Sequence, residues 1–264
     1  MRWAAALAAI AALAGAAPAH AAPTITMSGS VVTRALVADL AYFYRHAVRD
    51  PPRFALAGGV SATGIADAER GVVSAGMVVR GPLPGDPADL VFTRLALSGV
   101  CLVTNLANPV PAMTRAEVQD IVAGRVTSWS QIPGSTRTDA IVPIGLAPGA
   151  GTWQVFQVSF VDVGTPLAYA PITLATDLQA RDYIEQTPAA FGYLDLSMTG
   201  AVHAMRYEGV GCTRAAIRSG AYPAARPLGV VTRGRPRGAL ARFLRWATTS
   251  PVARRVIATR YLPV

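Results

Sequence analysis

Lysine is absent from this sequence, and acidic residues are few. All 24 basic residues are arginine, against 15 acidic ones, so the formal net charge is +9. Such a surplus attracts anions over a long range, whether small solutes, anionic lipid or a polymer. A solvated basic surface without a specific partner is the alternative. The arginines are scattered except at residues 233–237, where no aromatic side chains are interleaved, so we expect no nucleic-acid partner.

Cysteine is nearly absent as well, because only Cys101 and Cys212 occur, far apart in the chain. Two cysteines without histidine neighbours make no metal site. The phosphate-cradling GxxxxGK[ST] pattern, the HExxH pattern and the calcium-loop pattern are also missing. In an oxidising compartment the two thiols can form one disulfide, and otherwise they pack as small apolar groups. The sequence leaves both options open, and we expect no metal and no cofactor.

A long uninterrupted apolar run is missing after the N-terminus. Residues 1–21 hold one arginine, a short alanine-rich apolar stretch and small residues at Ala19 and Ala21, which is typical of a secretory signal peptide. We therefore expect cleavage near Ala21 and a mature chain that begins at Ala22. No cysteine stands there to carry a lipid anchor. The product is expected in the periplasm or outside the cell, and not to span a membrane.

Short β-rich runs alternate with amphipathic helices along the rest of the chain. Thr114 and Glu117 form a capping box, and Ser250 followed by Pro251 predicts the start of the last helix. With 52% hydrophobic residues the chain can bury a large core, and the alternation predicts an α/β fold of one or two domains. The predicted strands cover residues 24–27, 53–57, 95–104, 140–144 and 191–194.

Four segments, taken in order, resemble the phosphate-binding-protein family of periplasmic solute receptors that serve ABC importers. The segments are GSVVTRAL at 29–36, GVSATGI at 59–65, GAGT at 149–152, and a C-terminal pattern from SGAYP at 219–223 through RPL at 226–228 to YLP at 261–263. The resemblance extends over nearly the whole mature chain. Its specificity comes from the order of the segments.

The resemblance implies a two-lobed periplasmic binding protein of type II, in which each lobe is a mixed sheet flanked by helices and two crossover strands form the hinge. Lobe 1 would comprise residues 22–104 and 226–264, and lobe 2 residues 105–225. A small anionic solute, phosphate or another oxyanion, would bind between the lobes, which would close around it and deliver it to an ABC permease. The family implies a monomer that catalyses no reaction.

The glycine loops are the expected binding site. Each precedes a helix whose first backbone N–H groups are unpaired and carry partial positive charge, and glycine lets a ligand approach the backbone closely. Hydroxyl groups add further donors. Ordinary N-caps, which need no ligand, are the alternative role for the hydroxyl residues. The candidate ligand-binding residues are Ser30, Ser61, Thr63, Gly151, Thr152 and Arg34, the last as a substitute positive charge.

Several residues of the family's phosphate site are replaced in this chain. The family's anion-clamping arginine is Leu146, the serine of its third loop is Ala150, and its proton-accepting aspartate is Ser74. One charged hydrogen bond contributes about 1.5–3 kcal/mol. The replacements therefore predict weak affinity for phosphate and poor discrimination between protonated and fully ionised oxyanions.

Two other functional classes compete with the receptor interpretation. A secreted sensory or interaction protein would retain the fold without high-affinity transport, and a neighbouring sensor gene in place of permease and ATPase genes would distinguish it. The segment 59–63 partly matches the G-x-S-x-G motif of hydrolases, but the final glycine is missing. Neither His46 nor His203 has a sequence relationship to Ser61 that indicates a catalytic base. We therefore expect a binding protein and not an enzyme.

Overall fold

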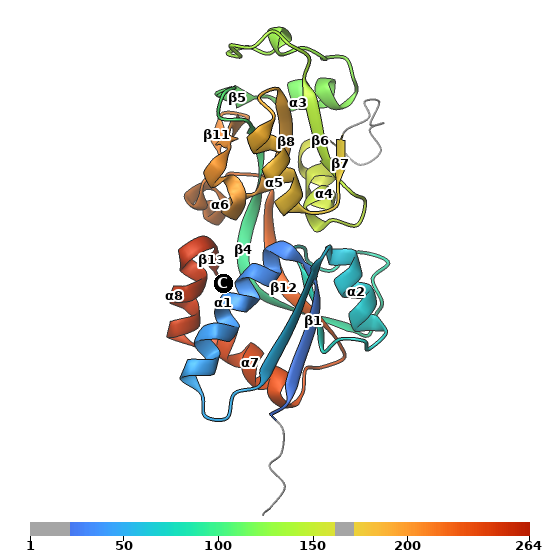
Figure 1. The fold of residues 1–264 in the computed structure, drawn as a ribbon, viewed down its shortest axis with the longest axis vertical. Helices are drawn as coiled ribbons and strands as arrows, with labels where there is room; N and C mark the ends of the chain where they lie inside the picture. The colour runs from blue at the N-terminus through green and yellow to red at the C-terminus, as the bar shows by residue number, and fades with distance from the viewer. Residues whose placement is uncertain (1–21, 162–171) are drawn as a thin grey trace, which may run out of the picture.

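The computed structural model describes residues 22–161 and 172–264. The predicted signal peptide and its cleavage site at Ala21 lie outside the described residues. Figure 1 shows two groups of elements, one above the other, which we call the lower and the upper lobe. Two long strands, β4 (Leu90–Thr104) and β12 (Ala225–Arg233), run between them. The α/β fold with two lobes predicted from the sequence is therefore confirmed.

The lower lobe is a mixed sheet flanked by helices. Its elements, besides β4 and β12, are β1 (Thr24–Ser30), α1 (Val31–Ala47), β2 (Arg53–Gly59), α2 (Ser61–Glu69), β3 (Ala75–Val78), α7 (Gly238–Thr249), α8 (Pro251–Arg260) and β13 (Leu262–Pro263). The strands follow the order β2-β1-β3-β12-β4, with β13 also paired to β4. β1 is parallel to β2 and β3, whereas β12 is antiparallel to β3 and β4.

The upper lobe continues the same sheet through β4, in the order β4-β8-β6-β7. A separate three-stranded sheet has the order β11-β10-β5. The strands of this lobe are β5 (Ala112–Met113), β6 (Val142–Leu146), β7 (Ile172–Leu174), β8 (Ala190–Asp195), β9 (His203–Ala204), β10 (Arg206–Tyr207) and β11 (Val210–Gly211). Its helices are α3 (Arg115–Val122), η1 (Trp129–Gln131), α4 (Gly151–Phe156), η2 (Gln157–Val161), α5 (Asp177–Gln186), η3 (Leu196–Ala201) and α6 (Arg214–Ser219).

β4 belongs to both lobes. Its residues up to Gly99 pair with β12, and Val100 to Thr104 pair with β8. The second half of the strand is buried throughout, as its nearly continuous apolar sequence indicates. One unbroken strand thus joins the lobes, and β12 crosses beside it. The predicted limits of the lobes, 22–104 with 226–264 and 105–225, stay a prediction.

Cys101 on β4 and Cys212, just before α6, form a disulfide with their Cα atoms 5.6 Å apart. The alternative of two separate thiols is therefore wrong. The bond fastens the segment before α6 to β4 and closes a loop with a sequence separation of 111. Such a long loop restricts the unfolded chain strongly, which favours the folded state.

Local capping signals are partly confirmed. Thr114 and Glu117 make the expected reciprocal capping box at α3, and the Ser250 hydroxyl accepts from the amide of Val252 at α8. Ser30 is the N-cap residue of α1 but makes no side-chain capping bond. Within residues 22–161 and 172–264, no helix is long and apolar enough to cross a membrane. The same residues contain no group of three or more histidine, cysteine, aspartate or glutamate side chains that could hold a metal ion.

Candidate functional site

Three glycine loops meet where the two lobes face each other. The first two follow the parallel strands β1 and β2, whose ends lie side by side because Ser30 is in register with Gly59. The third follows β6 and leads into α4 in the upper lobe. The amide of Ala62 donates to the carbonyl of Gly149 across the lobes, with N and O 3.2 Å apart. The three loops predicted to form one site are therefore in contact.

Glycine is required at two of these positions. A Cβ atom on Gly151 would lie 2.5 Å from Cγ2 of Val79 and 2.7 Å from Oγ of Ser61, so a side chain there would force the loops apart. Gly29 has a φ of +123° and its Cβ would lie 2.3 Å from the carbonyl oxygen of Met77. Both glycines permit close approach of backbone segments, as expected of a site built from loop backbone.

Three hydroxyl residues of the loops are buried, and none of them makes a side-chain capping bond. Ser30 is 3% exposed, Ser61 1% and Thr152 0%. None of the helices α1, α2 and α4 has a side-chain capping bond. Instead, Oγ of Ser61 accepts from the amide of Val79 at 3.2 Å. Ser30 therefore occupies the N-cap position of α1 without a side-chain capping bond, and Ser61 and Thr152 are not N-cap residues.

Two other candidate residues lie on the surface. Thr63 is exposed, in the first turn of α2, and lies near the end of β2 at Gly59. Arg34 is also exposed, and its Nε atom lies beside Gly58, 3.3 Å from where a Cβ would stand. Neither side chain belongs to the buried cluster of Ser30, Ser61 and Thr152. Their roles as ligand residues stay predictions.

The replaced family positions occupy different environments. Leu146 is 3% exposed and its amide donates to the Tyr193 hydroxyl at 3.0 Å, so an apolar side chain stands close to the third loop. Ala150 is likewise buried. Ser74, by contrast, lies outside the loop cluster, because its hydroxyl bonds to the backbone and side chain of Thr26. The expectation that Ser74 takes the place of a ligand-contacting aspartate is therefore not supported by its position.

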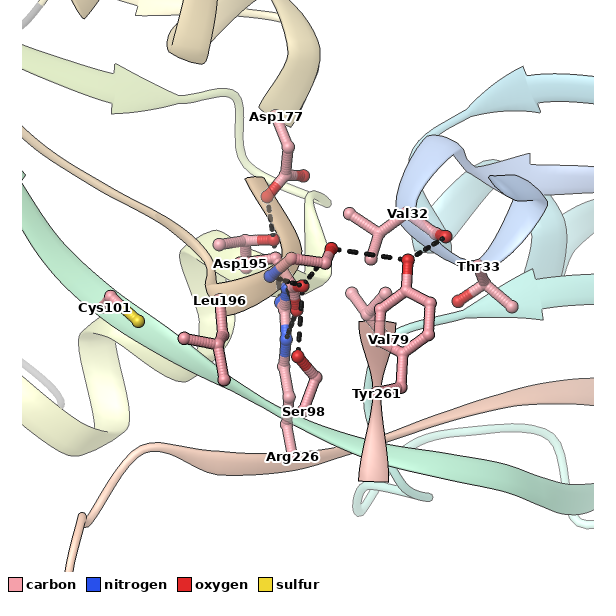
Figure 2. A network of polar contacts seen from close by, with 12 residues as sticks. Val32, Thr33, Val79, Ser98, Cys101, Asp177, Asp195, Leu196, Arg226 and Tyr261 are labelled. Atoms are coloured by element: carbon pink, nitrogen blue, oxygen red, sulfur yellow. Dashed lines mark hydrogen bonds and ion pairs between the residues drawn. The ribbon is translucent and has the colours of Figure 1, made fainter. Parts of the chain in front are cut away.

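A buried ion pair adjoins the third loop. Arg226 on β12 is 1% exposed, and its Nη2 and Nε donate to Oδ2 of Asp195 at 2.7 and 3.3 Å. Its Nη1 donates to the Thr152 hydroxyl at 2.7 Å, which in turn donates to Oδ1 of Asp177 at 2.6 Å. Figure 2 shows Arg226 extended between Ser98 and Asp195, with Asp177 beyond. The candidate ligand residue Thr152 is thus bonded to an arginine and a carboxylate of the protein itself.

The same network reaches the lower lobe through the C-terminal residues. Oγ of Ser197 lies 2.6 Å from Oδ1 of Asp195 and 3.3 Å from the hydroxyl of Tyr261. That hydroxyl donates to the carbonyl of Val32 at 3.2 Å, in the first turn of α1 (Figure 2). Burial raises the pKa of Tyr261 to about 12, so the phenol remains a donor at neutral pH. The network therefore connects the first turn of α1 with the first turn of α4.

Sequence reasoning missed this network. Arg226 stands in the RPL motif at 226–228, and its partners Asp195 and Asp177 lie 31 and 49 positions away from it. An arginine inside a strand that is otherwise apolar is the one signal that could have indicated a buried charge in need of a partner.

The buried charges beside Thr152 leave no surplus of positive charge. One guanidinium, Arg226, faces two carboxylates, Asp195 and Asp177. Burial raises the pKa of Asp177, and the nearby guanidinium opposes that shift without reversing it. An anion entering between the loops would therefore rely on backbone N–H groups and hydroxyls.

The two histidines of the described chain are bonded elsewhere. Nδ1 of His46 lies 2.8 Å from the carbonyl oxygen of Tyr42, and Nε2 of His203 lies 2.7 Å from that of Val110. Neither bond involves Ser61, so neither histidine is held as a base for that serine.

The family model described as "PBP superfamily domain" matches residues 14–251, which is most of the chain. The chain belongs to this superfamily. The resemblance carried by the glycine loops and the C-terminal segment is thereby confirmed. Members of this kind are binding proteins, in agreement with a site made of loops, hydroxyls and backbone amides.

Relatives within the superfamily share nearly the whole length of the chain. The phosphate-binding protein PstS of Bacillus subtilis (strain 168) is 25% identical over 247 residues, covering 91% of this chain and 81% of that protein. A Clostridium perfringens protein, named as a phosphate ABC transporter substrate-binding protein and solved with bound phosphate, has a TM-score of 0.85 at 22% identity, over 91% of this chain and 99% of that chain. An ABC-type phosphate transport receptor from Vibrio cholerae has a TM-score of 0.71, at the same identity and coverage. These structures show the shared two-lobed fold.

Proposed function

We propose that this chain is the solute receptor of an ABC importer, which captures a small oxyanion between its lobes and presents it to a permease. The observation that carries the proposal is the meeting of three glycine loops from two lobes, with Ser30, Ser61, Gly151 and Thr152 buried together. Each loop precedes a helix, and the first backbone N–H groups of a helix can donate to an anion. The named functions of the relatives support the same role.

The charged side chains beside the loops favour binding of a singly charged oxyanion over a doubly charged one. Leu146 provides no clamp, and the guanidinium that bonds the Thr152 hydroxyl, that of Arg226, is also bonded to Asp195. A dianion would approach the carboxylates of Asp195 and Asp177, and the exposed guanidinium of Arg34 beside Gly58 offsets that repulsion only weakly, because solvent screens it. Backbone amides and hydroxyls can still hold a single negative charge.

Calorimetric titration of the purified protein tests this function. Monovalent oxyanions (acetate, formate, nitrate) are compared with sulfate and with phosphate at mildly alkaline pH, and we expect the tightest binding from a monovalent ion. Ser61→Ala removes one hydrogen bond to the anion and should weaken binding about tenfold. Ser219→Ala, in an exposed position at the end of α6, is the matched control and should leave the affinity unchanged.

Two results would contradict the proposal, one its preference for a singly charged anion and the other the receptor role itself. Tight phosphate binding with sulfate excluded would show that the charge argument is wrong while the receptor role stands. Absence of binding by every oxyanion, with Ser61→Ala silent, would favour a secreted sensory or interaction protein. The direct bond between Ala62 and Gly149 fits that second outcome, since it lets the lobes meet without a solute.

A further inference from the structure

Exposed arginines gather at one end of the lower lobe, which we call the basic end (residues 45–53 and 233–245). The strands β1 and β2 begin there in register, and β12 ends there because it runs antiparallel to β3, which starts beside them. On α7, the ring of Phe243 lies 4.9 Å from that of Phe54 at the start of β2 and 5.3 Å from that of Tyr44 near the end of α1, between ring centroids. Figure 1 shows α7 and the start of β1 together at the lower end of this lobe.

Most of the positive charge at the basic end is not neutralised. Arg49 lies 3.9 Å from Asp50, and Arg233 lies 3.0 Å from Asp89. Glu69, the last residue of α2, adds one exposed carboxylate. Six further arginines are exposed and have no carboxylate partner among the described residues: Arg45, Arg53, Arg235, Arg237, Arg242 and Arg245. The basic end therefore carries a clear surplus of positive charge.

The basic end contains a hollow of ≈ 460 Å³. Arg233, Arg235 and Arg237 line it, together with Ser74 and Thr232. The hydroxyls of the last two residues are already bonded within the protein. The guanidinium groups are therefore the main donors that the hollow offers to a ligand. A guanidinium group matches the geometry of phosphate oxygens, so the hollow suits a phosphate group.

The arginines are spread over the whole basic end instead of converging on the hollow. They come from the end of α1, the start of β2, the segment after β12 and the exposed face of α7. A single small anion would contact only the hollow, whereas a plane of repeated negative charges can attract all of them. Within residues 44–53 and 233–249 no large apolar side chain is exposed. The attachment that this surface supports is therefore electrostatic, without insertion of side chains into an apolar phase.

We propose that the basic end binds the surface of a membrane rich in anionic phospholipid, with one phosphate head group in the hollow. The negative potential of such a surface attracts each exposed arginine that comes within a Debye length of it. The solute loops lie at the opposite ends of β1 and β2, each 7 residues long, which at about 3.3 Å per residue is about 20 Å away. Attachment therefore leaves the loops uncovered. The inference does not depend on the proposed oxyanion site.

Co-sedimentation of the chain that begins at Ala22 with lipid vesicles tests this proposal. At low ionic strength we expect binding to vesicles that mix phosphatidylglycerol with phosphatidylcholine, and no binding to phosphatidylcholine alone. High salt should release the protein, because it screens exposed charges. Glycerol 3-phosphate at millimolar concentration should not displace the protein, because it fills only the hollow. Equal binding to both kinds of vesicle, binding to neither, or displacement by glycerol 3-phosphate would overturn the proposal.

Two double variants locate the surface. Arg235→Gln with Arg237→Gln should lower the partition coefficient about twentyfold, since each arginine near an anionic surface contributes about fivefold. Arg206→Gln with Arg218→Gln, at exposed positions of the upper lobe, removes the same charge and should leave the coefficient nearly unchanged. Equal losses in both variants would overturn the proposal, because net charge alone would then control binding. Ser61→Ala should not affect vesicle binding, so failure here and failure of the oxyanion site are distinguishable.

Discussion

Arg226→Met should destabilise the protein strongly. The arginine is 1% exposed and Asp195 is 0% exposed, and their closest atoms lie 2.7 Å apart. Methionine keeps the apolar stem but removes the guanidinium, which leaves the carboxylate with the hydroxyls of Ser98 and Ser197 and one backbone amide as its donors. Removing one partner of a buried ion pair costs about 3–5 kcal/mol, because the other charge stays in the interior. We expect the free energy of unfolding to fall by about that amount.

A second substitution distinguishes the destabilisation caused by the unpaired carboxylate of Asp195 from that caused by the lost packing. Asp195→Asn in the Arg226→Met background removes the uncompensated carboxylate and retains an oxygen acceptor. The double variant should therefore be more stable than Arg226→Met, by about 2 kcal/mol. Arg233→Met is the control, since Arg233 forms an exposed pair with Asp89 and its loss should cost less than about 1 kcal/mol.

Urea denaturation at neutral pH, followed by tryptophan fluorescence, measures all four proteins. The comparison requires that the dependence of the unfolding free energy on urea stays the same among them. A loss below about 1 kcal/mol in Arg226→Met would refute the reasoning. So would a double variant that is less stable than Arg226→Met, because the carboxylate would then not be the source of the destabilisation.

Gly151→Ala should prevent the loops from meeting, seen as faster hydrogen exchange at the Ala62 amide, and unchanged protection would contradict the contact with Gly149. Replacing both Cys101 and Cys212 with alanine should lower the free energy of unfolding by about 2–4 kcal/mol in urea; no change would argue against the disulfide. Burial raises the folded-state pKa of Asp177, so its contribution to stability falls as the pH rises from about 3.8 through that pKa. Asp177→Asn should gain stability relative to the wild type over that range, and a pH-independent difference would contradict the shift.

Much of the fold follows from local patterns. The strands at residues 95–104 and 140–144 could be predicted because apolar runs bounded by turns need no knowledge of the partner strand. The capping box at Thr114 is equally local, since its two bonds join residues three positions apart. The order of the glycine loops indicates the two-lobed arrangement. The glycines of these loops and the helices that follow them remain recognisable, although residues such as Leu146 and Ala150 differ from the family pattern.

The interior of the site could not be predicted in the same way. A serine before a helix has the same sequence signature whether it caps that helix or bonds elsewhere, and only the structure shows that Ser61 accepts from Val79. Motif alignment placed Ser74 at the ligand, whereas its bonds to Thr26 place it outside the loop cluster. The partners of Arg226 depend on three distant segments meeting at one point, which no local pattern specifies.

The position of β12 determines the order in which the lobes can form during synthesis. In the lower sheet it lies between β3 and β4, although it is made after every strand of the upper lobe. Until Ala225 has left the ribosome, β3 lacks the neighbour that joins it to β4, and both β3 and β4 offer an unpaired edge. The upper lobe, second in the sequence, is therefore the first that can be completed. Nascent chains that end before β12 should lose β1 to β3 to a protease, whereas chains that include it should resist digestion.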